Sequence, residues 1–292
     1  MNLEGIDNKD IDMTKLTIAD KWILNKLNET AKEVNENIKN YRIGEVAHIL
    51  YDFFWNSYCD WYVEIAKIQL SDDTQKANTQ RVLRHVLDMS LRLLHPIMPH
   101  ITERVWQLMP KSADEKASAI IVADYPVFNQ KFAFEKEAKE MELVFETIKS
   151  LRNVRQSFNI SPSIKVDAII DADSSEIDTF KEIEAYIHRL AKVENISYDA
   201  QKAPKKSASA VVWASKIIVP LEDLIDVDSE VARQNKKLEK LSAEKNSLAG
   251  RMKNEKFVAN APKELIEQTT ARIEELELQE TTIKELIEML KS

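Results

Sequence analysis

The sequence predicts a mainly α-helical protein with a helical bundle, a small α/β connecting module and a C-terminal antiparallel coiled-coil hairpin. In the first half of the chain, apolar residues recur at steps of three and four, which is the period of a helix that buries one face. From Ile164 the period changes to two, as in half-buried strands. After Val231 two heptad stretches follow each other, and heptads predict a coiled coil.

These changes of period divide the chain into four parts. Residues 1–18 are a polar lead-in segment, and residues 19–158 are the bundle with the long helix that follows it. Residues 159–226 form the α/β module, and residues 227–292 form the hairpin arm.

The first bundle helix is expected to start near Asp20, with Thr17 or Asp20 as its cap. The second bundle helix is expected over about residues 43–69. Seven of the 21 aromatic residues of the chain crowd into residues 51–62 of the second helix. A helix that is apolar on every side is normally buried in the middle of a bundle, which we expect for most of these rings. One or two of them are expected at a rim, where a ring could stack on an unstacked nucleobase.

A polar run to Gln80 is expected to separate the second helix from the third, which ends at a corner made by Pro96 and Pro99. Proline cannot continue a helix interior but suits the first turn of the next helix. Pro99 therefore predicts a short fourth helix that carries Ile101 and Trp106 inward. The four helices together predict an up-and-down bundle.

An irregular crossing over residues 111–130 follows, in which the apolar triplet from Ile120 to Val122 is expected to lie along the bundle. A long helix is expected at 133–157. The α/β module is expected to contain one helix and four short strands, at 175–191 and at 164–170, 195–199, 209–214 and 216–220.

The arm is predicted from two runs of inward positions. The first run is Val231, Gln234, Leu238, Leu241, Lys245, Leu248 and Met252, and the second is Ile266, Thr269, Ile273, Leu276, Glu280, Ile283, Ile287 and Leu290. A turn around Asn260 to Pro262 would fold them back on each other. Residues 233–256 carry eight bases and three acids, a local charge of +5 in a chain of net charge −8.

Composition limits the functions that the chain can carry. The chain has three glycines, whereas average usage of about 7% predicts roughly twenty. It therefore has no glycine-rich loop that could bind the phosphates of a nucleotide. One cysteine excludes an internal disulfide, and the five histidines form no ligand spacing, so we expect neither metal nor cofactor here. The sequence contains no apolar run long enough to span a membrane and no signal peptide. We therefore expect a cytoplasmic location. The negative net charge counts mildly against nucleic-acid binding unless bases cluster locally.

Several stretches resemble the C-terminal part of the valyl-tRNA synthetases, which are class I aminoacyl-tRNA synthetases. They are LLHPIMPHITERVWQ at the proline corner, FFWNSYCDWYVEIAK in the aromatic helix, SLRNVRQSFNISPS after the bundle and NEKFVANAPKELIEQ at the tip of the hairpin. Isoleucyl and leucyl relatives fit less well, because the former usually end in a cysteine-rich zinc module and the latter lack this heptad hairpin. The His-x-Gly-His and Lys-Met-Ser-Lys words of the catalytic domain are missing.

The resemblance implies an anticodon-binding bundle and an arm that contacts the outer corner of the L-shaped tRNA. In the whole enzyme, valine is activated with ATP and Mg²⁺ and joined to tRNA(Val), whereas this part has no catalytic or editing site and should be inactive alone. We expect a monomer that binds tRNA(Val) and neither DNA nor membrane.

Candidate RNA-contacting residues in the bundle region are polar groups beside aromatic faces, followed by two arginines. They are Arg42, Trp55, Asn56, Asp60, Trp61, Glu64, Arg152 and Arg155. Asn56, Asp60 and Glu64 share a helical face at four-residue spacing. The same residues can be explained without RNA. The polar residues could simply solvate the exposed side of a helix, the aromatic rings could belong to the core, and the arginines could stabilise the C-terminal end of a helix dipole.

In the arm the candidates are the bases of its first helix, namely Arg233, Lys236, Lys237, Lys240, Arg251, Lys253 and Lys256. A solvated charged face is the competing interpretation. The alternative function is a non-catalytic α-helical scaffold whose coiled coil docks another protein, which explains the heptads but not the confinement of the basic excess to one helix.

Overall fold

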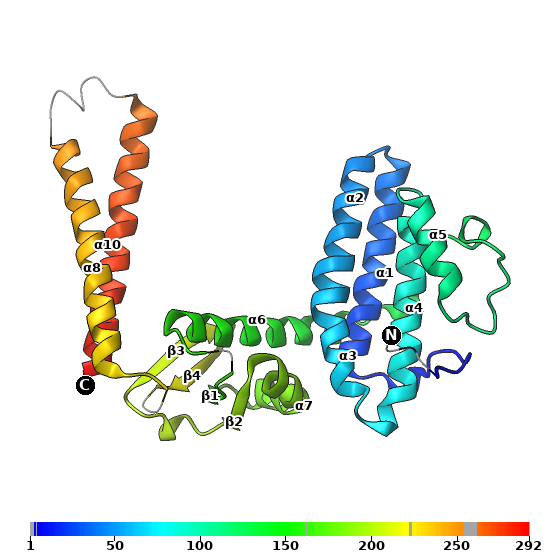
Figure 1. Ribbon diagram of the computed structural model, residues 1–292, viewed down its shortest axis with the longest axis horizontal. Coiled ribbons are helices and arrows are strands. Elements are labelled where there is room, and N and C mark those ends of the chain that lie inside the picture. The colour runs from blue at the N-terminus through cyan, green and yellow to red at the C-terminus, as the bar shows by residue number, and fades with distance from the viewer. Residues whose placement is uncertain (1–2, 4, 162, 222–223, 254–261, 292) are drawn as a thin grey trace. The chain divides into compact units, whose positions relative to one another are not determined.

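The structure is a computed structural model that describes residues 3, 5–161, 163–221, 224–253 and 262–291. Helices make up most of it, together with one small sheet (Figure 1). The described chain divides into two compact units, Met1–Glu146 with Thr179–Leu190, and Thr147–Asp178 with Ala191–Ser292. The long helix α6 (Glu135–Ser157) and helix α7 (Ser174–Ala191) contribute residues to both units.

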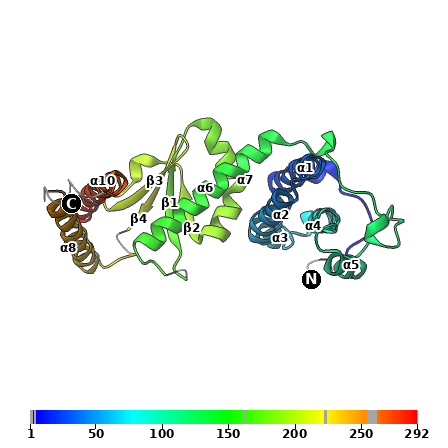
Figure 2. The same ribbon diagram turned by 90° about the horizontal axis from the view of Figure 1, so that it is seen from above.

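The first unit is the predicted helical bundle. Its helices are α1 (Ile18–Lys39), α2 (Ile43–Tyr51), a π-helical segment (Asp52–Tyr62), α3 (Val63–Gln69), α4 (Asp73–Leu94) and α5 (Pro99–Leu108). The α2, π-helical and α3 segments follow one another without a break and occupy the predicted second helix. Figure 2 looks almost along α1, α2 and α4, with α5 beside α4.

The start of α1 is closed by a capping box, as the sequence suggested. The Thr17 side chain accepts a hydrogen bond from the Asp20 backbone N–H, and the Asp20 carboxylate accepts one from the Thr17 N–H at 2.9 Å. Asp20 is nevertheless buried, and its other carboxylate oxygen accepts a hydrogen bond from the Tyr62 hydroxyl at 2.6 Å. The cap thus connects α1 to the end of the π-helical segment.

Ser71 lies in the predicted break between α3 and α4, but the polar run from Asp73 to Gln80 is helical, so the prediction that this run also separates the helices was wrong. Asp72 caps α4 by accepting a hydrogen bond from the Thr74 N–H at 2.8 Å. Asn78 exchanges two hydrogen bonds with the backbone of Asp12 in the lead-in segment, at 2.8 and 3.0 Å. Polar residues can be buried on a helix when their hydrogen bonds are satisfied, and periodicity alone could not reveal these partners.

The proline corner has the predicted form, with Pro99 in the first turn of α5. Trp106 is fully buried, but Ile101 is 57% exposed, so its predicted place in the core was wrong. Of the apolar triplet only Ile120 is buried, because a 3-10 turn over Ile120–Val122 directs the next two side chains outward. Ile121 and Val122 are 75% and 67% exposed.

The second unit contains the predicted mixed module. Its strands are β1 (Val166–Asp171), β2 (Val193–Ser197), β3 (Ser207–Val212) and β4 (Ser215–Pro220), in the order β2-β1-β4-β3. β1 pairs in parallel with β2 after the crossover through α7, and antiparallel with β4. The two central strands bury Ile170, Ile217 and Val219, which is the reason for their apolar alternation.

The arm is an antiparallel hairpin of α8 (Val227–Met252) and α10 (Lys263–Lys291), as predicted (Figure 1). Every predicted inward position of both helices is buried or half-buried. The Lys245 ammonium binds the buried Glu280 carboxylate at 2.6 Å across the seam, and the Ser242 hydroxyl donates to the same carboxylate at 2.5 Å. The predicted turn around Asn260 lies outside the described residues. Within the helices that the structure describes, none is long and apolar enough to cross a membrane.

The buried contact between Tyr62 and Asp20 gives a stability prediction. Burial raises the pKa of Asp20, while the Tyr62 hydroxyl lowers it. We expect Tyr62→Phe to reduce the free energy of unfolding by about 1–3 kcal/mol at neutral pH, because a buried carboxylate loses a donor. The pKa of Asp20 should rise further in the variant. The deficit should therefore shrink as the pH falls through that pKa and the carboxyl becomes protonated.

Urea unfolding at several pH values measures this deficit. Tyr51→Phe is the matched control, because Tyr51 is 62% exposed on the same continuous helix and a surface change of this kind stays within about 0.5 kcal/mol. Equal losses in the two variants would show that the buried hydrogen bond contributes nothing.

Candidate nucleic-acid interface

An exposed pair of aromatic rings lies where α2 passes into the π-helical segment. The Tyr51 and Trp55 rings stack with centroids 6.3 Å apart and planes inclined by 8°. Their side chains are 62% and 53% exposed, in contrast to Phe53, Tyr58 and Tyr62 of the same run, which are buried. The sequence predicted rings at a rim and selected Trp55. It missed Tyr51, although the four-residue spacing of the two rings was the available signal.

The polar candidates follow on the same continuous helix. Asn56 is exposed and donates a hydrogen bond from its amide nitrogen to the Asp52 carboxylate at 2.7 Å, and its amide oxygen accepts no hydrogen bond from the described residues. Asp60 is exposed, and its carboxylate has no hydrogen-bond or ion-pair partner among the described residues. Glu64 binds Lys67 at 2.5 Å. Asn56 and Asp60 are therefore the members of the set whose groups remain available.

Two further candidates have contrasting positions. Trp61 is half-buried, and its ring lies 4.3 Å from that of Phe145, which also meets Trp22. Trp61 therefore packs the bundle against α6. Arg42 is exposed immediately before α2, and its guanidinium has no ion-pair partner among the residues that the structure describes. Next to it, Tyr41 is 91% exposed with a left-handed φ of 57°.

The two arginines at the end of α6 also differ. Arg152 is exposed, and its side chain is not free of interactions with the rest of the protein. Arg155 is 6% exposed, and its guanidinium donates to the backbone carbonyls of Ala191, Lys192, Ser161 and Ile164. Burial lowers the pKa of Arg155. Its donors are occupied in holding the end of α6 to the loop before β1 and to the end of α7, so they are not available to contact RNA.

The basic residues of the arm lie on α8 and the residue after it. Arg233 binds Glu230 at 2.6 Å and donates to the carbonyl of Ser157, so it is anchored at the base of the arm. The remaining described candidates are exposed and have no carboxylate partner among the described residues, and they are Lys236, Lys237, Lys240, Arg251 and Lys253. Lys256 lies outside the described residues.

The second helix of the arm has the opposite charge. α10 carries four bases and eight acids. Arg272 of this helix binds Glu244 of α8 at 2.9 Å and Glu275 at 2.8 Å. The exposed bases of α8 therefore have no equal on α10, and a polyanion would be attracted to α8 rather than to α10.

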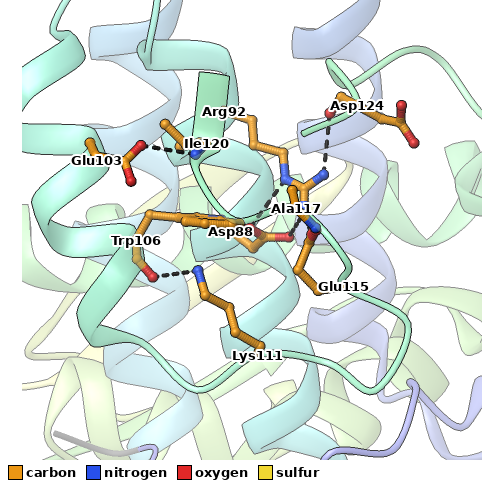
Figure 3. A network of polar contacts seen from close by, with 9 residues as sticks. All are labelled: Asp88, Arg92, Glu103, Trp106, Lys111, Glu115, Ala117, Ile120 and Asp124. Carbon is orange, nitrogen blue, oxygen red and sulfur yellow. Dashed lines mark hydrogen bonds and ion pairs between the residues drawn. The ribbon is translucent and has the colours of Figure 1, made fainter. Parts of the chain in front are cut away.

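A polar network that the sequence did not predict lies between α4, α5 and the crossing after α5 (Figure 3). Asp88 accepts hydrogen bonds from the Trp106 indole at 2.6 Å and from Arg92 at 2.8 Å, and Arg92 also binds Glu115. The Lys111 ammonium donates to the Trp106 carbonyl at 2.5 Å and lies over the indole ring. Burial lowers the pKa of Lys111 to about 8. Short-range sequence patterns contain no signal for contacts between such distant residues.

Metal ligands were not expected, and the described residues contain no group of three or more His, Cys, Asp or Glu side chains placed to hold a metal ion.

Comparison with known proteins matches two parts of the chain to family profiles. A family profile described as "Anticodon-binding domain of tRNA ligase" matches residues 20–170, and one described as "Valyl tRNA synthetase tRNA binding arm" matches residues 226–291.

Curated relatives match along the whole chain. A valine–tRNA ligase of Enterococcus faecalis is 36% identical over 297 aligned residues, which cover 100% of this chain and 33% of the relative. That of Fervidobacterium nodosum is 36% identical over 100% of the chain and 32% of its own length. That of Staphylococcus haemolyticus is 37% identical over 97% and 32%.

The chain thus spans about a third of the length of these relatives. The arm profile is specific for the valyl branch and covers the hairpin from end to end, so the isoleucyl and leucyl alternatives are not needed. The chain belongs to the valyl-tRNA synthetase family, and it carries that family's anticodon-binding domain and tRNA-binding arm.

Proposed function

We propose that the chain binds tRNA(Val) through two separate surfaces. In the first, Asn56 and Asp60 read the anticodon while Trp55, supported by Tyr51, stacks on an unstacked loop base. In the second, the bases of α8 contact the tRNA backbone at its outer corner. The single observation that carries the proposal is the occurrence of both matched RNA-binding domains on one chain.

The charges favour a division of labour between these surfaces. Residues 20–110 contain 11 bases and 12 acids, so the bundle has little general attraction for phosphate. Readout there has to depend on stacking and on hydrogen bonds to base edges, which is how proteins recognise single-stranded loops. The exposed bases of α8 supply the attraction that the bundle lacks, because contacts with phosphates release counterions and dominate affinity.

The activity proposed for the whole protein is that of a valine–tRNA ligase, which joins valine to tRNA(Val) with ATP and Mg²⁺. The catalytic and editing sites would lie in the parts that the relatives have and this chain lacks. We infer that the chain itself holds no cofactor, acts as a monomer and works in the cytoplasm. The monomer is supported by the arm, whose seam is filled by the two helices of one chain.

The isolated chain should neither form valyl-adenylate nor charge tRNA, because it has no glycine-rich loop to hold the phosphates of ATP. Valine-dependent exchange of pyrophosphate into ATP measures the first step. Exchange above background in protein free of host synthetase would contradict this expectation.

The α8 surface should control the salt dependence of tRNA binding. We expect the triple variant Lys236→Ala, Lys237→Ala and Lys240→Ala to weaken binding and to reduce the slope of log K against log salt. The reduction should be about one for every phosphate that the variant no longer neutralises. Filter binding with tRNA(Val) at several salt concentrations measures both quantities.

The matched control removes three exposed bases from the other helix of the arm, by Lys263→Ala, Lys284→Ala and Lys291→Ala. This variant changes the net charge equally and should leave the slope near that of the unmodified chain. If both triple variants reduce the slope alike, the bases of α8 act only through net charge. No measurable binding by the unmodified chain would instead favour the protein-docking scaffold.

The anticodon surface should affect discrimination with little effect on stability. Asn56→Ala and Asp60→Ala are expected to change the ratio of affinities for tRNA(Val) and for the same tRNA with a substituted anticodon. Trp55→Ala should weaken binding to both by about 1–3 kcal/mol, because stacking tolerates any base. Trp61→Ala should instead destabilise the bundle, by less than the about 3–5 kcal/mol of a fully buried ring because Trp61 is half-buried.

Thermal unfolding and binding to both tRNAs, measured for each variant, separate these effects. An unchanged ratio of affinities in both polar variants would place anticodon reading on another part of the bundle.

A further inference from the structure

A cavity of about 680 Å³ opens in the first unit, and none of the residues proposed to bind tRNA lines it. It lies between the lead-in segment, α4, the crossing after α5, and Phe132. Its volume is in the range of pockets that hold small organic ligands. The sequence marks nothing here, and neither matched domain description assigns a ligand to it.

The inner surface of the cavity combines an aromatic face with an unused hydrogen-bonding group. The His85 and Phe132 rings lie 5.3 Å apart at 48°. Burial lowers the pKa of His85 to about 4, so its ring is neutral at physiological pH, with one nitrogen donating and the other accepting. Neither nitrogen has a hydrogen-bond partner among the described residues. A planar heterocycle could stack on Phe132 and bind His85 through its edge.

One wall of the cavity is held rigidly by the network in Figure 3. Asp88 is fixed by the Trp106 indole and by Arg92, and Arg92 is fixed in turn by Glu115 and by the Asp124 carbonyl. The wall therefore keeps its shape without a ligand. Preorganisation of this kind reduces the free-energy cost of binding.

The charges on the cavity are unevenly compensated. Two of its acids, Asp88 and Glu115, are already paired with Arg92. By contrast, Lys116 and Lys131 are exposed and have no carboxylate partner among the described residues, although Lys131 also lies over the Phe132 ring. The acids Asp10, Asp114 and Asp124 of the same lining likewise have no ion-pair partner among the residues that the structure describes. The lining as a whole is therefore not strongly basic, and Lys131 beside the Phe132 ring is the ammonium group placed to meet a phosphate attached to a planar base.

We propose that this cavity binds a single nucleotide, with its base stacked on Phe132 and bonded to His85, and its phosphate next to Lys131. The nucleotide has two possible sources, a loop nucleotide of the bound tRNA or a free nucleoside monophosphate. The first source rests on the proposed function, whereas the second is independent of it.

Histidine NMR signals of the full chain test the proposal directly. The chain has five histidines, and His85→Gln identifies the signal of His85. AMP, CMP, GMP and UMP are titrated in turn, with inorganic phosphate as the comparison. At least one nucleotide should shift the His85 signal saturably, and phosphate should shift it less. No saturable shift with any nucleotide, or an equal shift with phosphate, would overturn the proposal.

Phe132→Ala should weaken nucleotide binding about tenfold, since an aromatic ring that stacks on a base contributes about that much. Phe128→Ala is the matched control, because Phe128 is also covered by a lysine, with Lys32 at 5.6 Å against Lys131 at 5.7 Å, but does not line the cavity. Lys131→Ala changes an exposed residue and should weaken binding without changing the melting temperature. Equal affinities in the Phe132, Lys131 and Phe128 variants would contradict the assignment.

Filter binding of tRNA(Val) distinguishes the two sources. If a loop nucleotide enters the cavity, saturating mononucleotide competes with tRNA and Phe132→Ala weakens tRNA binding. If only the free nucleotide enters, tRNA affinity stays unchanged in both experiments. Failure of the unmodified chain to bind tRNA would refute the proposed function and leave the NMR result standing.

Discussion

The buried carboxylate of Asp20 is the contact on which the bundle depends most. One of its oxygens caps the first turn of α1, and the other receives the Tyr62 hydroxyl at the end of the π-helical segment. Gln69 extends the network by donating to Thr17 at 2.7 Å and to the Tyr186 hydroxyl of α7 at 3.2 Å. An isolated buried charge is costly, and a fully bonded one fixes the arrangement of its donors. The network therefore sets which rings face inward and, as a result, that Tyr51 and Trp55 face outward.

Charge is distributed unevenly over the chain, and under the proposed function affinity and selectivity come from different places. The bundle is close to neutral, while the solvent-facing bases of the arm are confined to α8, opposite an acidic α10. The negative net charge of the chain counted mildly against RNA binding, and this segregation answers that objection. A neutral recognition surface also limits binding to wrong RNAs, because it attracts no phosphate unless a base fits.

Much of the fold could be predicted from periodicity. The heptads of the arm, the strands of the module and the corner at Pro99 all have local causes, and the structure has each of them. The failures have a common origin in distant partners. The polar start of α4 is helical because Asn78 finds the backbone of Asp12, 66 residues away. Ile101 and Ile121 are exposed although their residue type favours the core, because a short helix and a 3-10 turn have only one covered side.

The candidate site was harder to predict because side chains of one type have different roles. Arg152 and Arg155 are one helical turn apart, yet one is exposed and the other is buried among carbonyls. Trp55 and Trp61 differ in the same way. The cavity beside His85 could not have been found at all, since its walls come from four separated stretches of chain.

The π-helical segment from Asp52 to Tyr62 makes the length of this region intolerant of change. An i→i+5 helix is wider than an α-helix and is uncommon outside functional regions. Deleting one residue would allow α geometry, but it would rotate all that follows by about 100° relative to α2. Tyr62 would then turn away from Asp20, and Trp55, which lies inside the segment, would also move relative to Tyr51. Insertions and deletions among relatives should consequently avoid this stretch, even though substitutions at its exposed positions are tolerated.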